Sequence, residues 1–183
     1  MTDSDFALFD TAIGSCAIAW GGRGILGVQL PEGDETRTRA RMRRRFPTAR
    51  ETSPPADVRR AIDGIVALLS GEAVDFSAVA LDMERVPAFH RRVYEVARTI
   101  GRGATLTYGE IAKRLGVPAE AREVGEALGR NPFPIIVPCH RVLAAGGKLG
   151  GFSAPGGAAT KRRLLAIEGA RTNDAPDLFD RAH

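Results

Sequence analysis

Cysteine and histidine are scarce in this sequence. Its 183 residues contain two cysteines, Cys16 and Cys139, and three histidines. Two cysteines are too few for the disulfide framework of a small secreted domain, so we expect a reducing compartment, the cytoplasm. Residues 1–89 contain Cys16 and no histidine, which argues against a structural zinc site in the first half. We expect no metal, and the sequence contains no cofactor motif.

Long apolar runs are also missing. No stretch approaches the roughly 20 apolar residues that a membrane-spanning helix needs. The acidic start, residues 1–5, lacks the basic segment of a signal peptide. We therefore expect a soluble protein with no membrane partner. With 44% hydrophobic and 26% charged residues, the composition is that of a globular protein of one large domain or two small ones.

Charge is unevenly divided along the chain. Residues 1–84 hold 10 Lys/Arg and 13 Asp/Glu, a balance of −3, whereas residues 85–170 hold 14 and 6, a balance of +8. A basic segment indicates a polyanionic partner such as nucleic acid. A basic solvated surface would give the same counts, so both interpretations stay open at this point.

The first half has the pattern of a small α/β unit without evident chemistry. Short apolar stretches in residues 6–30 are separated by glycines, with a turn at 21–24, which predicts an antiparallel meander. Cys16 lies in its middle strand, where we expect a small buried side chain. Helical spacing follows over 34–46 and 56–69, and residues 78–81 are expected to return as a strand. The arginines of 34–46 indicate a solvated helix face rather than a second DNA site.

The second half predicts two short helices joined by a tight turn. After a helix that starts near Pro87 and stops at Gly101, Thr107 and Glu110 have the spacing of a capping box. A further helix is expected from Val117 to Gly129. Two such helices in a basic segment favour a helix-turn-helix, although the pattern is degenerate.

Residues 138–142, Pro-Cys-His-Arg-Val, are the most informative stretch of the chain. They follow the β-branched run 135–137, which predicts a buried strand that ends at Cys139. A thiol held beside His140 is a candidate nucleophile. Side chains of neighbouring strand residues point to opposite faces, so a direct bond between the two requires a turn or a bridging water.

Together these motifs resemble those of the O6-alkylguanine-DNA alkyltransferases, the methylated-DNA–protein-cysteine methyltransferases. The resemblance covers residues 87–170 and rests on features that occur in the order of that family. They are Tyr108, the helix around Arg122, Asn131-Pro132, Pro138-Cys139-His140-Arg141-Val142 and Glu168-Gly169.

The resemblance implies a role for each matched residue. Cys139 would accept the alkyl group irreversibly, in a single turnover. His140 would act on the thiol through a water, and Glu168 would hold the imidazole. Asn131 would tie the helix-turn-helix to the cysteine segment. Tyr108 would assist extrusion of the base and protonate the departing guanine.

The partner implied is double-stranded DNA that contains O6-alkylguanine, bound by a monomer. The damaged base must leave the stack, and Arg122 would fill its place from a helix on which Gly125 permits close approach. The alternative for Arg122 is a surface ion pair with Glu126. The base pocket is expected to include Leu128, Val142, Phe152 and Ser153.

The expected fold is α/β (α+β), with two domains and a tail. Residues 1–85 would form a ribonuclease-H-like domain with an antiparallel sheet, 86–170 a winged helix-turn-helix-like alkyltransferase domain, and 171–183 a flexible C-terminal tail.

Two other functions are weighed against the main one. The first is a non-enzymatic binder of alkylated DNA. Alkyltransferase-like relatives of this kind have the same scaffold with the cysteine replaced, so the presence of Cys139 argues against it. The second is a cysteine hydrolase that uses Cys139 with His140 or His90.

Overall fold

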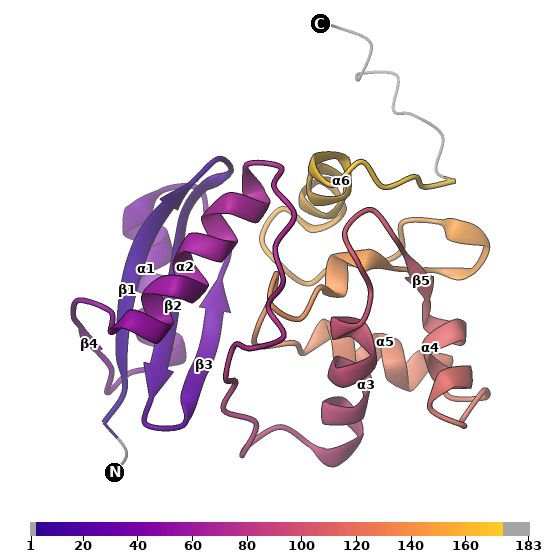
Figure 1. Cartoon of the computed structure of the whole chain (residues 1–183), viewed down its shortest axis with the longest axis horizontal. Helices are drawn as coiled ribbons and strands as arrows, with labels where there is room; N and C mark the ends of the chain where they lie inside the picture. Colours follow the sequence, from indigo (N-terminus) through magenta and orange to yellow (C-terminus); the bar gives the residue numbers. More distant parts are fainter. Residues whose placement is uncertain (1–2, 174–183) are drawn as a thin grey trace, which may run out of the picture.

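A four-stranded sheet forms the first half of the molecule (Figure 1). The computed structural model describes residues 3–173. The strand order is β3-β2-β1-β4, in which β1 to β3 form the predicted antiparallel meander and β4 runs parallel to β1. The strands are β1 (Asp5–Thr11), β2 (Gly14–Gly21), β3 (Gly24–Gln29) and β4 (Arg50–Glu51).

One helix covers each face of this sheet. The two are α1 (Glu35–Arg45) and α2 (Ala56–Leu69). Successive strand side chains point to opposite faces, so Ala17 and Ala19 of β2 pack with Met42 of α1. Ile18 and Trp20 belong instead to the large core that includes the apolar stripe of α2. The predicted position of both helices in the sequence is therefore confirmed.

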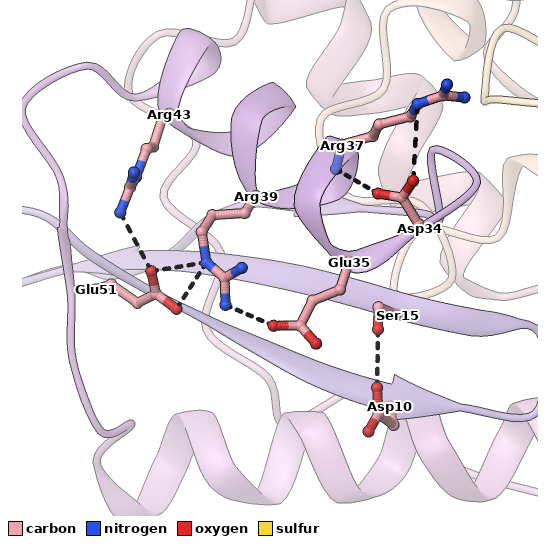
Figure 2. A network of polar contacts seen from close by, with 8 residues as sticks. All are labelled: Asp10, Ser15, Asp34, Glu35, Arg37, Arg39, Arg43 and Glu51. Atoms are coloured by element: carbon pink, nitrogen blue, oxygen red, sulfur yellow. Dashed lines mark hydrogen bonds and ion pairs between the residues drawn. The ribbon is translucent and has the colours of Figure 1, made fainter.

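The arginines of α1 mostly pair with nearby carboxylates (Figure 2). Arg39 bridges Glu35, at 2.6 Å, and Glu51, at 3.1 Å. The Asp34 side chain caps the helix by accepting a hydrogen bond from the Arg37 backbone N–H. These contacts agree with a solvated helix face, as the sequence predicted.

The second half consists of helices and one short pair of strands. Its helices are α3 (Ala88–Arg98), α4 (Tyr108–Arg114), α5 (Ala121–Gly129) and α6 (Gly157–Ile167). Strand β5 (Leu106–Thr107) runs parallel to β6 (Val142–Leu143). The 3₁₀ turns are η1 (Cys139–Arg141) and η2 (Ala145–Gly147).

Helices α4 and α5 form the predicted helix-turn-helix, with α3 packed against α5. The capping box is present, since Thr107 Oγ1 accepts from the Glu110 N–H while Glu110 accepts from the Thr107 N–H. The start predicted for the second helix was wrong. Residues 117–120 form a turn, and the helix begins at Ala121.

Two predicted strands are not formed. Residues 78–81 make a single bridge, between Ile25 and Leu81. The β-branched run 135–137 lies in a turn, where Ile135 has a φ of +74° and the Val137 N–H donates to the Phe133 carbonyl. Prolines 132, 134 and 138 lack the N–H groups that a ladder needs, which explains why burial of this run does not produce a strand.

Arg45 joins the two halves of the molecule. Its guanidinium donates to the Val28 carbonyl at 2.7 Å, to Gln29 Oε1 at 3.1 Å and to the Pro132 carbonyl at 3.3 Å. The Val28 N–H also donates to Pro132, at 2.8 Å. A side chain on Gly27 would meet this guanidinium, because its Cβ would lie 2.7 Å from Arg45 Nη2. The N-terminal unit thus holds the segment that leads to Cys139.

The domain boundary near residue 85 stays a prediction. Of the predicted tail, residues 174–183 lie outside the described residues. Its described part ends at Asn173, whose backbone N–H donates to Gly147 at 2.9 Å and whose side chain donates to Gly146 at 2.7 Å.

Candidate active site

Cys139 is the first residue of the 3₁₀ turn η1, directly after Pro138. The predicted strand end is replaced by this turn. Cys139 is partly buried, whereas His140 and Arg141 are buried. Even with a turn, no hydrogen bond joins the thiol to the imidazole within residues 3–173, because neither ring nitrogen of His140 has a hydrogen-bond partner of good geometry there. A bridging water could therefore connect the Cys139 thiol to the His140 imidazole.

Asn131 braces the turn that carries Cys139. Its Nδ2 donates to the Val137 carbonyl at 2.9 Å, and its Oδ1 accepts from the Phe133 N–H at 2.9 Å. The following Pro132 keeps Asn131 out of the helical region. The bond to Val137 reaches the segment that carries Cys139, and the role of Asn131 as a link to the helix-turn-helix stays a prediction.

The thiol of Cys139 stays protonated in its resting state. Burial raises its pKa, and the Asn131 side chain, the Lys161 charge and nearby backbone N–H groups oppose this rise only in part. Burial penalises a thiolate because the charge is removed from water. A nucleophilic role for Cys139 therefore requires a base to take its proton.

A buried charge network lies behind the turn. His140 Nε2 lies 3.1 Å from Glu168 Oε1, and Arg141 Nη2 lies 2.7 Å from the same oxygen. Burial by itself raises the pKa of Glu168, but hydrogen bonds and charges from His140 and Arg141 outweigh it and lower that pKa to about 2. Burial lowers the pKa of His140, against the opposing effect of Glu168. The imidazole is therefore held neutral and able to accept a proton.

A cavity of about 340 Å³ opens in front of the thiol. The Tyr108 ring packs close to α5, since a Cβ on Gly125 would lie 3.8 Å from it, which is ordinary contact. Burial raises the pKa of Tyr108, so its hydroxyl remains a proton donor at neutral pH. The cavity is lined by Tyr108, Gly125, Leu128, Gly129, Cys139, Gly151, Phe152 and Ser153.

Three of the four predicted pocket residues line this cavity, namely Leu128, Phe152 and Ser153. Val142 is buried behind it, and its carbonyl accepts a hydrogen bond from Lys161 Nζ at 2.6 Å. The Ser153 hydroxyl donates to the Gly129 carbonyl at 2.7 Å, which ties the loop to the end of α5.

Arg122 lies exposed in the first turn of α5. The alternative that pairs it with Glu126 is not what the structure has, because Glu126 forms its ion pair with Arg130, at 2.8 Å. Arg122 is therefore available to a partner.

Known proteins of one family match this arrangement. The model for the DNA-binding domain of 6-O-methylguanine DNA methyltransferase matches residues 88–170. A methylated-DNA–protein-cysteine methyltransferase from Methanothermobacter thermautotrophicus is 38% identical over 152 residues, which cover 83% of this chain and 78% of that protein. The chain belongs to this family.

Further relatives agree with this assignment. The methylated-DNA–protein-cysteine methyltransferase from Mycobacterium bovis is 45% identical over 129 residues, covering 70% of this chain and 76% of its own. The crystal structure of Mycobacterium tuberculosis O6-methylguanine methyltransferase has a TM-score of 0.72 and 36% identity, and it covers 97% of this chain and 98% of its own. A structure of the M. tuberculosis protein OGT in complex with DNA has the same TM-score and identity over 90% and 92%. The resemblance deduced from the sequence motifs is thus confirmed, as is the mixed α/β class.

Sequence reasoning on this methyltransferase missed two buried cations at the site. Lys161 Nζ donates to the Val142 and Gly151 carbonyls and lies 5.8 Å from the centre of the Tyr108 ring. Residues 161–163 are all basic, so residue type does not show which of them is buried. The only signal is that position 161 shares a helix face with Leu164 and Leu165. The other buried cation is Arg141, to which the family resemblance assigned no role.

Neither a metal centre nor a membrane span is found in the part of the chain that the structure describes. No group of three or more His, Cys, Asp or Glu residues within 3–173 is arranged to hold a metal ion. None of the helices there is long and apolar enough to cross a bilayer.

Proposed function

We propose that this protein repairs DNA by transferring the alkyl group from O6 of a damaged guanine to Cys139 Sγ. The observation that carries the proposal is the position of that thiol. It lines a cavity with Tyr108 and Phe152 in front and has the buried pair His140–Glu168 behind, in a chain that belongs to the methyltransferase family. An aromatic wall and a nucleophile in one cavity suit a flipped base.

The proposed step forms one bond and breaks one. Sγ attacks the alkyl carbon, the carbon–O6 bond breaks, and its electron pair leaves with guanine. The thiol proton passes to the neutral imidazole of His140, with a water as the connection. The Tyr108 hydroxyl supplies a proton to the departing base. The thioether has no route back, so each molecule acts once, without a cofactor.

We further propose that the partner is double-stranded DNA containing O6-alkylguanine, bound by a monomer in the cytoplasm. Exposed Arg122 would occupy the space that the flipped base leaves, while Gly125 allows the backbone of α5 to approach the minor groove. The net charge of +8 over residues 85–170 suits a phosphate backbone.

Intact-mass measurement after incubation with O6-methylguanine duplex DNA tests this function. We expect a stoichiometric gain of one methylene unit, located on the peptide that contains Cys139. The Cys139→Ala variant should bind DNA and gain no mass. The matched control is Cys16→Ala, because Cys16 is fully buried and burial raises its pKa to about 12. Binding without modification would favour the non-enzymatic alkylated-DNA binder, and repeated turnover of an unmodified protein would favour a hydrolase.

A further inference from the structure

Arg141 makes a two-pronged contact with Glu168 that uses most of its hydrogen-bonding capacity. Its Nε donates to Oε1 at 3.2 Å and to Oε2 at 3.0 Å, and its Nη2 donates to Oε1 at 2.7 Å. Its Nη1 donates to the Ile100 carbonyl at 2.5 Å. Arg141 is 7% exposed and Glu168 is 3% exposed, so water screens this contact very little.

The same carboxylate also faces His140, so Arg141 and the imidazole share one of its oxygens. Oε1 is the oxygen that lies 2.7 Å from Arg141 Nη2 and 3.1 Å from His140 Nε2. A planar guanidinium that binds a carboxylate through two nitrogens fixes its orientation as well as its charge. Arg141 therefore determines both where Oε1 points and how much negative charge His140 experiences.

The negative charge that Glu168 presents to His140 matters, because only a neutral imidazole can accept the thiol proton. A lone carboxylate beside a buried histidine would stabilise the imidazolium form. The charged groups that bear on His140 are Glu168 and Lys161 from α6 and Arg141 from η1, with the Cys139 thiol adjacent in η1. Two of these three are cations, so Glu168 can orient the ring without forcing a proton onto it.

We propose that Arg141 is a positioning residue for alkyl transfer, which neutralises Glu168 so that this carboxylate orients His140 while leaving it a free base. The inference rests on the proposed function, because it explains how His140 takes the proton of Cys139. The guanidinium does not touch the reacting atoms. Its effect on the reaction passes through Glu168.

The test compares single-turnover transfer rates of four proteins between pH 5.5 and 9. With Arg141→Met, His140 should become protonated at higher pH, so the rate near pH 6 should fall roughly tenfold or more and recover toward the wild-type value in alkali. Arg141→Lys keeps the charge and should restore most of the profile. The matched control is Arg102→Met, since Arg102 donates to the Gly71 carbonyl and to the Ile167 carbonyl at the end of α6.

A double variant keeps the test decisive if Arg141→Met folds poorly. Arg141→Met/Glu168→Gln removes both charges, so His140 should stay neutral and the loss of rate at low pH should disappear. Titration of the imidazole nitrogens by NMR follows His140 directly among three histidines. A rate that is lowered equally at every pH, with an unchanged His140 titration, would overturn the inference. Failure of the wild-type protein to acquire the alkyl group would instead overturn the proposed function.

Discussion

Glu168 is the residue on which the charges of the site converge. It lies at the end of α6, and its carboxylate contacts His140 and Arg141, both buried. The contacts lower its pKa to about 2, although burial alone would raise it. A depressed carboxyl pKa gives stability above the unfolded value, near 4.5, which is lost as pH falls through the folded value. His140, whose pKa burial lowers, acts in the same direction, since it must gain a proton in acid.

We therefore expect acid to destabilise this protein through Glu168. Urea unfolding should show that the wild type loses about 2 kcal/mol more than Glu168→Gln between pH 7 and pH 3. Glu126→Gln serves as the control, because Glu126 forms an exposed ion pair with Arg130, and exposed pairs contribute little. Equal losses in the wild type and Glu168→Gln would contradict this account.

At the residue scale the sequence indicated the family but not which side chains contact one another in the site. The order of Tyr108, Asn131 and the cysteine pentapeptide was enough to name the family. It did not reveal that Lys161 is buried beside Cys139, because burial of a cation depends on carbonyls supplied by Val142 and Gly151, which are distant in sequence. Sequence spacing also allowed an ion pair between Arg122 and Glu126. In the structure Glu126 pairs with Arg130 instead.

Among the elements, α4 begins with a capping interaction directly beside a residue of the site. Its N-cap is Thr107 and its first residue is Tyr108, so loss of the cap would loosen the turn that holds the phenol. We expect Thr107→Ala to lower the free energy of unfolding by about 1 kcal/mol and to slow alkyl transfer. Asp34→Ala removes the N-cap of α1 in the N-terminal half (Figure 2) and should cost similar stability while leaving the transfer rate unchanged.

Thermal unfolding and single-turnover kinetics on the same preparations separate the two effects. If both variants lose equal stability and both keep the wild-type rate, the proposed coupling between the cap and Tyr108 is wrong.

Elements with a periodic pattern and an end signal were predictable, whereas those set by distant partners were not. The meander, α1, α2 and the capping box follow from local residues. The run 135–137 was mistaken for a strand because β-branched residues signal burial as much as strand geometry. Its observed conformation is held by the Asn131 side chain, which bonds the Phe133 N–H two residues along the chain and the Val137 carbonyl six residues along.

On the scale of the whole molecule, the N-terminal unit contacts the active-site segment through a desolvated cation. Burial lowers the pKa of Arg45, which is consistent with a guanidinium held by carbonyl oxygens rather than by an acid. Nothing in the arginine-rich run 37–45 distinguishes this residue from its neighbours, so the link between the halves could not be predicted from the sequence.

Gly27→Ala tests this link without removing a charge. Its Cβ would lie 2.7 Å from Arg45 Nη2 and 2.9 Å from the Phe46 ring, so the guanidinium must shift from the position in which it bonds Pro132. We expect a loss of about 1–3 kcal/mol in stability and slower transfer at temperatures where the variant remains folded. Gly22→Ala is the matched control, since a Cβ there meets no atom of the described residues within 4 Å apart from its chain neighbours. A wild-type rate in Gly27→Ala would show that the N-terminal unit does not influence the site.

The pairing of Asn131 with Pro132 has a consequence for how the protein ages. An asparagine deamidates spontaneously when the backbone nitrogen of the next residue attacks its side-chain carbonyl and forms a succinimide. Proline has no N–H, so this route is blocked at Asn131. The Asn131 amide is also held by two hydrogen bonds. A protein that reacts once must wait intact for a damaged base, and the side chain that braces its thiol is chemically durable during that wait.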